Sequence, residues 1–175
     1  MSCVPDHQTG LVLSPMRSED LPEVLALQAE GYSADLHDSR PAFESRMALS
    51  PTMNLVARRG PTLVGYLVSH SWASHAPPPV DAILAVQAPM ECWYVHDLSV
   101  APAARGTGVT RALLARGADE ARRLGLERSE LIAVAGAAPF WEKQGWQAAN
   151  SVTPALAAKV AGYGAQAVFM TRTPI

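Results

Sequence analysis

The spacing of apolar and polar residues changes along the chain in a way that separates strands from helices. Apolar residues recur at helical spacing in 18–32, 39–50 and 107–124, and a shorter helix fits 139–145. Short apolar runs predict strands at 11–13, 55–57, 63–68, 93–100, 129–135, 146–148 and 166–172. The resulting order, β-α-α-β-β-β-α-β-α-β-β, predicts a mixed, mostly antiparallel sheet with helices on both faces, in the α/β (α+β) class.

Residues that typically begin or end helices support these boundaries. Ser18 is predicted to cap the first helix and Ser39 to open the second. Gly125 is predicted to end the third helix as the residue just beyond it. Gly117 lies on the apolar face of that helix, where it lowers helix propensity by about 1 kcal/mol relative to Ala. We therefore expect the helix to approach the sheet closely at this point.

Two segments lack a clear pattern. Residues 74–91 are irregular and rich in proline, with a helical turn expected near 81–86. Residues 154–163 are expected to form a loop with a possible helical turn. Loops as long as 74–91 are often functional in compact domains. A variable surface excursion explains that segment equally well.

Composition fits a globular protein. The chain has 175 residues, of which 49% are hydrophobic and 17% are charged. One domain over 1–175 is the natural interpretation of this length, with residues 1–10 expected to be mobile. The formal charge of −2 gives no general attraction for nucleic acid or an anionic membrane, so neither is expected as a partner.

The cysteine content and the amino-terminal segment point to the cytoplasm. Cys3 and Cys92 cannot form a disulfide framework, and Cys92 is expected to be a small core residue in a reducing compartment. The first residues lack the basic and apolar regions of a signal peptide, and no apolar run has the length of a membrane span. We therefore expect a cytoplasmic location, and we predict no metal site.

The stretch 93–124 carries the strongest chemical signal. A predicted strand is followed by the segment Arg105-Gly106-Thr107-Gly108-Val109-Thr110 and then by a long helix. The first amides of a helix lack partners inside the helix and attract anions, so a phosphate is the usual guest. Glycine lets the backbone approach a ligand closely, and the arginine adds a forked donor for phosphate oxygens.

Three other interpretations of this turn can be compared with its sequence. A P-loop requires Lys after its second glycine, and none is present. A dinucleotide-binding fingerprint that began at Gly106 would place its third glycine at Arg111. A turn in which the glycines have only a structural role is the remaining alternative.

The wording of this region resembles the acyl-CoA-binding motif of the GNAT superfamily of N-acetyltransferases, Gln/Arg-x-x-Gly-x-Gly/Ala. Arg105 and Gly108 match, whereas Thr110 stands where the family has Gly or Ala. The lead-in 96–102 and the later run 138–146 are also similar to family segments. The resemblance covers nearly the whole chain and implies a twisted sheet of about six to seven strands with a splayed parallel pair.

The resemblance implies acetyl-CoA as co-substrate. Its pantetheine arm would lie where strand 93–100 splays from strand 129–135, and an irregularity near Asp97 and Leu98 would free backbone groups for it. Thr110 adds bulk at the phosphate turn and also a hydroxyl that could bond to phosphate. The predicted cofactor-binding residues are Leu98, Ser99, Val100, Arg105, Gly106, Thr107, Gly108, Val109 and Thr110.

The implied reaction moves an acetyl group to a primary amine by direct attack in a ternary complex. The amine must lose a proton to a base, and a backbone amide near Leu98 would stabilise the charge on the thioester oxygen. Glu91, His96 and Asp97 are the candidate bases, and each could instead be a structural polar residue. Trp141 follows Phe140 where the family often has a tyrosine as general acid, and indole cannot serve as one.

The missing tyrosine keeps other functions open. The chain could be a non-catalytic acyl-CoA-binding module, or an acyltransferase with another acyl chain or a hydroxyl acceptor. The acceptor, a small-molecule or peptide amine, would meet the junction of the first two helices, where Asp35 and Asp38 lie, as well as the segments 74–91 and 150–164. Those two aspartates and Glu91 would suit a cationic amine or form an ordinary solvated patch. A homodimer is compatible with the sequence, and no residue decides it.

Overall fold

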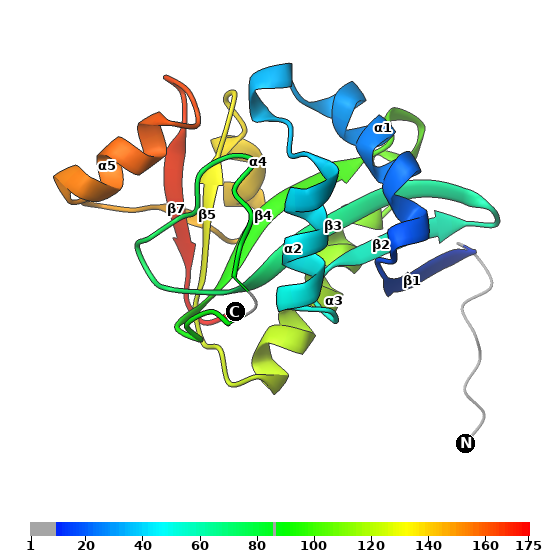
Figure 1. Ribbon diagram of the computed structural model, residues 1–175, viewed down its shortest axis with the longest axis horizontal. Helices are drawn as coiled ribbons and strands as arrows, with labels where there is room; N and C mark the ends of the chain where they lie inside the picture. The colour runs from blue at the N-terminus through cyan, green and yellow to red at the C-terminus, as the bar shows by residue number, and fades with distance from the viewer. Residues whose placement is uncertain (1–9, 86) are drawn as a thin grey trace.

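The computed structural model describes residues 10–85 and 87–175. Seven strands form one sheet in the spatial order β1-β2-β3-β4-β5-β7-β6 (Figure 1). Neighbouring strands are antiparallel except for β4 and β5, which confirms the mixed, mostly antiparallel sheet. The strands are β1 (Leu11–Pro15), β2 (Leu55–Arg59), β3 (Thr62–Trp72), β4 (Cys92–Val100), β5 (Ser129–Ala133), β6 (Gln147–Ala148) and β7 (Val168–Arg172).

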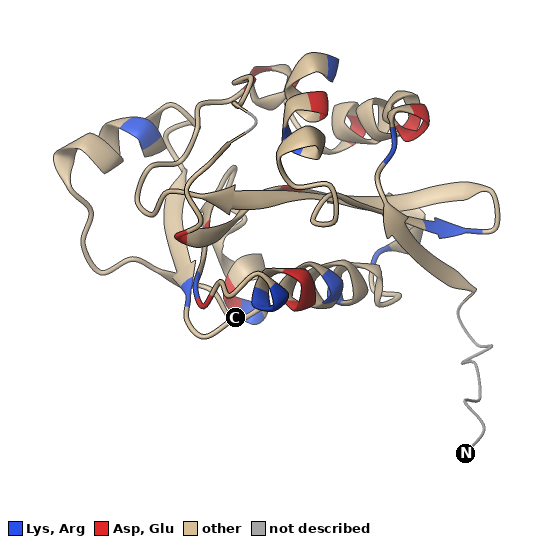
Figure 2. Cartoon of the chain, turned by 60° about the horizontal axis from the view of Figure 1, so that its bottom comes forward, with Lys and Arg blue, Asp and Glu red and all other residues tan. Residues whose placement is uncertain are grey.

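Helices cover both faces of this sheet, as the sequence predicts. Viewed with the sheet nearly edge-on, α1 and α2 lie on one side and α3 on the other (Figure 2). Charged residues are visible along the length of α3. The helices are α1 (Leu21–Gly31), α2 (Arg40–Leu49), α3 (Val109–Arg123), α4 (Ala138–Lys143) and α5 (Pro154–Ala161).

Three expectations about element boundaries change. Ser18 does not cap the first helix, because a 3-10 turn (Ser18–Asp20) precedes α1 and Asp20 occupies the N-cap position. Helix α3 begins at Val109 rather than 107, because Gly106 and Gly108 have positive φ and cannot be helical. The expected loop after β6 contains a full helix, α5, whose first turn is capped by the Thr153 hydroxyl.

Two expected features fall wholly or partly outside the described residues. Residues 1–9, expected to be mobile, are not among them. The helical turn expected near 81–86 ends at position 86, which is also outside the description. Residues 80–81 form a turn and 82–85 have no regular structure. The segment 74–91 is therefore irregular wherever it is described before β4.

Two apolar cores position the central strands. One lies between the sheet and α3, and it includes Leu67, Trp93 and Leu113. A Cβ added at Gly117 would lie 2.8 Å from both Leu67 and Trp93, which confirms the expected close approach of helix and sheet. The other core packs α1 and α2 against the opposite face. Cys92 is fully buried, as expected of a small core residue.

A β-bulge at His96 changes which side chains of β4 share a face. Val68 pairs with Asp97 and Ser69 pairs with Val95, so His96 is the extra residue. Strict alternation would put His96 and Asp97 on opposite faces. The bulge instead directs both side chains to the α1–α2 face. The irregularity expected near Asp97 and Leu98 is thus present one residue earlier.

Candidate active site

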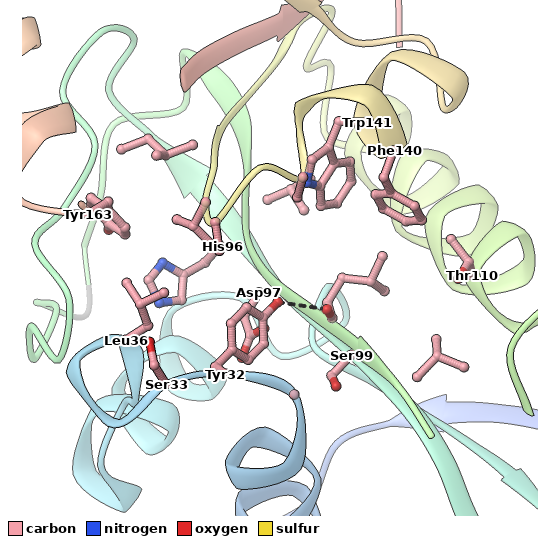
Figure 3. Close-up of a pocket in the computed structure, with 18 of the residues that line it drawn as sticks. Tyr32, Ser33, Leu36, His96, Asp97, Ser99, Thr110, Phe140, Trp141 and Tyr163 are labelled. Carbon is pink, nitrogen blue, oxygen red and sulfur yellow. Dashed lines mark hydrogen bonds between the residues drawn. The ribbon is translucent and has the colours of Figure 1, made fainter. Parts of the chain in front are cut away.

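The parallel strands β4 and β5 pair only at their first residues. Trp93 pairs with Ser129 and Tyr94 with Glu130, and beyond these pairs the strands diverge. A cleft of about 670 Å³ lies in the gap, and both strands contribute to its walls. Its lining also includes Arg105, Gly106 and Thr110, so the cleft leads to the glycine turn before α3 (Figure 3). This is the splayed pair that the sequence comparison implied.

Backbone groups of β4 face the cleft. The Ala101 amide donates to the Val64 carbonyl on β3, and alternate residues of a strand direct their backbone groups to opposite edges. Residues 98 and 100 therefore direct theirs away from β3. In agreement, the Leu98 carbonyl accepts from the Tyr32 hydroxyl at 2.8 Å. The Leu98 amide points to the same side and is available to a ligand.

The glycine turn presents free amides. Gly106 has φ of 74° and Gly108, the N-cap residue of α3, has φ of 86°. An added Cβ would meet nothing within 4 Å at either position, so open space lies in front of both. The first bond of the helix runs from the Ala112 amide to the Gly108 carbonyl, which leaves the amides just before it outside the helical ladder. The turn can therefore bind an anion.

The structure brings most of the predicted cofactor residues together. Six of them line the cleft: Leu98, Ser99, Val100, Arg105, Gly106 and Thr110. Gly108 lies in the same turn. The Thr107 hydroxyl instead accepts from Arg59 at 2.9 Å, and the Val109 side chain is buried in the core. The Thr107 amide also donates, to the Ala104 carbonyl at 3.4 Å, so Thr107 offers no free donor, and Val109 can contribute only through its backbone.

The three candidate bases are in very different places. Glu91 is exposed at the opposite end of β4, where its carboxylate accepts from the Ser74 amide at 2.9 Å, and it does not line the cleft. Asp97 lines the cleft but accepts from the Tyr66 hydroxyl at 2.6 Å. Burial raises the pKa of Asp97, although its hydrogen bond with Tyr66 acts in the opposite direction. Glu91 therefore lies outside the cleft, whereas Asp97 lies in it with one carboxylate oxygen bonded to Tyr66 and the other, Oδ1, without a partner among the described residues.

His96 lines the cleft with one nitrogen engaged and one free. Its Nε2 lies 2.5 Å from Oδ2 of Asp38, in the connection between α1 and α2. The two side chains are only 5% and 3% exposed. Nδ1 is buried and has no hydrogen-bond partner in the part of the chain that the structure describes. Asp97 also lines the cleft and its Oδ1 has no partner among the described residues, so what distinguishes His96 is the carboxylate of Asp38 that holds its ring.

Comparison with known proteins identifies the family. Residues 21–146 match the model of the acetyltransferase (GNAT) family. The match spans well over half of the chain and contains β4, the glycine turn, α3 and β5. This chain belongs to the GNAT family. A search of the curated proteins found no match.

Solved GNAT structures share this fold at low sequence identity. Ard1 from Thermoplasma volcanium is 13% identical with a TM-score of 0.72, over 95% of this chain and 99% of that one. Arabidopsis thaliana Naa50 in complex with the bisubstrate analogue CoA-Ac-MVNAL is 13% identical with a TM-score of 0.68, over 94% and 99%. The GphF GNAT-like decarboxylase in complex with isobutyryl-CoA is 18% identical with a TM-score of 0.73, over 93% and 98%. The likeness shows the fold, and a fold alone does not fix a reaction.

Two tyrosines outside the predicted catalytic and cofactor-binding sets also line the cleft of this GNAT protein. Tyr32, at the end of α1, is held between the Leu98 carbonyl and the buried Asp97. Burial, and then the charge of Asp97, raise the pKa of Tyr32 well above its usual value. Tyr163, after α5, donates to the Pro78 carbonyl and so joins α5 to the segment 74–91. Both belong to segments expected to meet the acceptor, and only the fold brings the two segments to the same cleft.

The end of the cleft around His96 is lined by apolar side chains together with Tyr32, Ser33, Asp38 and Asp97. Figure 3 shows the His96 ring between Tyr163 and Leu36. The apolar side chains at this end are Leu36, Val80, Ile132, Val134 and Tyr163. Asp35 and Glu91, expected to attract a cationic amine, do not line it. On the other side Trp141 packs edge-on against Phe140 and Trp146, as expected of a packing residue.

Two further observations concern metal binding and membrane-spanning helices. In residues 10–85 and 87–175, no group of three or more His, Cys, Asp or Glu side chains is arranged to hold a metal ion. Within the same ranges, none of the helices has both the length and the apolar character that crossing a membrane requires.

Proposed function

We propose that this GNAT protein transfers an acetyl group from acetyl-CoA to a primary amine. The observation that carries the proposal is the continuous cleft from the diverging β4 and β5 to the free amides before α3. Such a cleft suits a long ligand with an anionic end and an extended, partly apolar arm. The anionic end meets a helix N-terminus, and the arm meets free backbone groups of a strand.

The residues present fit acetyl-CoA. The turn 105–110 would hold the phosphates, since its glycines leave open space in front of the amides. The backbone of Leu98 and Val100 would pair with the pantetheine arm. When bound, acetyl-CoA supplies an activated acyl group as a thioester. The Leu98 amide is the donor that would stabilise the charge developing on the thioester oxygen.

The transfer step balances with the groups present. The acceptor arrives as an ammonium ion, because an alkylamine has a pKa near 10.4 in the lysine reference case. His96 removes one proton, and the freed lone pair forms the new C–N bond while the C–S bond breaks. The sulfur leaves with the bonding electron pair. The nitrogen then loses a second proton, so that one proton ends on sulfur and the other in solvent.

The acceptor end of the cleft favours an amine with an apolar body. Its walls are the apolar side chains around His96, and the two carboxylates in the described lining, Asp38 and Asp97, already have hydrogen-bond partners. A second charge on the acceptor would be desolvated without a partner, which is unfavourable. We therefore expect a monoamine rather than a polyamine or an amino acid.

The test measures amine-dependent CoA release from acetyl-CoA, with mass spectrometry of the acceptor. The expected result is stoichiometric release of CoA and formation of an N-acetyl product. Tight acetyl-CoA binding with no product from any amine would favour a binding module instead. Faster turnover with a longer acyl-CoA, or with the alcohol analogue of an amine, would favour the two alternative acyltransferases.

A further inference from the structure

We infer that Asp38 is the positioning residue for proton transfer: it fixes the ring of His96, which lines the cleft, with the buried Nδ1 as the proton acceptor. The inference rests on the proposed function, because it needs an ammonium substrate that must lose a proton. No local sequence motif predicts that Asp38 and His96 form a pair. They are 58 positions apart in the chain and meet through the fold.

Asp38 is itself held on two sides. Its Oδ1 accepts from the Asp81 amide at 2.6 Å, which leaves Oδ2 for His96. The Asp38 backbone is held by Gln28, whose side-chain amide accepts from the Asp38 amide and donates to the Asp38 carbonyl, both at 2.9 Å. A carboxylate fixed at both its backbone and one oxygen restricts the ring of its partner to one orientation.

The ionised state of Asp38 decides the tautomer of His96. Burial acts to raise the pKa of Asp38. The charge of His96 and its hydrogen bond to Asp38, together with the charge of Arg46, outweigh burial and lower the pKa to about 2. A carboxylate that is ionised at neutral pH can only accept a hydrogen bond. Nε2 of His96 must therefore carry the proton and donate. In the neutral ring Nδ1 is then the bare nitrogen, and it is the atom without a partner.

Other titratable or charged groups surround this pair. Tyr94 on β4 and His70 on β3 pack against the His96 ring, with centroids 6.1 Å and 6.5 Å away. Asp97 follows on β4, Tyr163 lines the same cleft, and the fully buried Arg46 of α2 acts on Asp38. In this surrounding Asp38 supplies the hydrogen-bonded anion that stabilises the imidazolium formed when Nδ1 takes the proton.

The kinetic test compares Asp38→Asn with His96→Gln, after wild-type turnover on an amine is established. We expect His96→Gln to lower kcat about 100-fold or more, the usual contribution of a positioned base. Asp38→Asn should lower kcat at least about tenfold, with KM for acetyl-CoA nearly unchanged. It should also move the acid limb of the kcat/KM profile to lower pH, because the anion that favours the imidazolium is gone.

The control is Asp35→Asn, which removes one negative charge from the same connection at an exposed position outside the cleft. It should keep the wild-type rate and pH profile. A wild-type acid limb in Asp38→Asn, at full kcat, would overturn the inference while leaving the acetyltransferase proposal intact. Absence of turnover by the wild type on every amine would instead refute the proposed function.

A second measurement uses only the wild-type protein and His96→Gln, so it does not depend on the folding of an Asp38 variant. Nitrogen-15 NMR of the wild-type protein reports which ring nitrogen carries the proton, and the His96→Gln spectrum assigns the signals. We expect Nε2 to be protonated and Nδ1 bare at a pH where the ring is neutral. A neutral His96 with its proton on Nδ1 would refute the inference, since Nδ1 could then not accept a proton from the substrate.

Discussion

At the scale of single residues, two neighbouring histidines have opposite roles. His96 has a carboxylate partner, whereas His70 is fully buried and its Nδ1–H donates to the Ser71 carbonyl at 3.0 Å. Burial lowers the pKa of His70 to about 3, against an ordinary value near 6.5. The ring is therefore neutral in the folded protein and becomes charged after unfolding whenever the pH is below about 6.5.

This difference predicts how stability depends on pH. Between pH 6.5 and 3 the unfolded chain binds a proton at His70 that the folded protein does not bind, so stability falls as the pH falls. From pH 6.5 to pH 5 the loss from this residue is about 2 kcal/mol, at about 1.4 kcal/mol per pH unit. His70→Phe should remove this part of the decline. Urea unfolding of both proteins at pH 7 and pH 5 measures it, and equal declines would contradict the assignment.

At the scale of elements, one glycine precedes α3 and another follows it, and the two are expected to differ in their effect on ligand binding. Gly108 before the helix and Gly125 after it have positive φ, and an added Cβ would meet nothing within 4 Å at either position. Replacing either with alanine places an L-residue in the left-handed region, which costs about 1–2 kcal/mol. Only Gly108 adjoins the amides proposed to bind phosphate.

The two glycines therefore make a matched pair of variants. Gly108→Ala and Gly125→Ala should destabilise the protein by similar amounts in thermal unfolding. Gly108→Ala should also weaken acetyl-CoA binding about tenfold or more, because relief of the strain moves the amides of the turn. Isothermal titration calorimetry with acetyl-CoA separates the two variants. Equal affinities for both would show that the glycine at 108 has only a structural role.

At the scale of the whole molecule, the acceptor end of the cleft is assembled from segments that are distant in sequence. The α1–α2 connection supplies Leu36 and Asp38, the segment 74–91 supplies Val80, and the chain after α5 supplies Tyr163. Hydrogen bonds from Tyr163 to the Pro78 carbonyl and from the Asp81 amide to Asp38 tie these segments together. The proposed choice of acceptor thus depends on the complete fold.

This assembly predicts which amines react. Hexylamine should have a kcat/KM at least about tenfold above that of 1,6-diaminohexane, and phenethylamine should exceed phenylalanine by a similar factor. Each pair differs by one charge, and a tenfold preference corresponds to about 1.4 kcal/mol. The physical reason is that the second charge would meet apolar walls or occupied carboxylates. Equal or greater activity with the diamine or the amino acid would contradict the proposed acceptor class.

Much of the architecture could be predicted because it depends on local patterns. The period of the apolar residues determined the order of strands and helices, since each element buries one face. Arg105 and Gly108, with the strand before them and the helix after them, were sufficient to place the turn that is proposed to bind phosphate. Helix α5 and the 3-10 turn at Ser18–Asp20 were missed, because weak local signals such as Thr153 do not outweigh the loop-like composition around them.

The sequence alone thus determined the fold class and the turn proposed to hold the cofactor phosphates, because both follow from residues adjacent in the chain. Only the tertiary structure shows that Glu91 lies outside the cleft and that His96 and Asp97 line it. The bulge in β4 brings His96 to the face where Asp38 lies, and an inserted residue in a ladder has no signature in the strand that carries it. The direction of a side chain on a strand, and the residues that it meets, depend on how that strand pairs with strands distant in sequence.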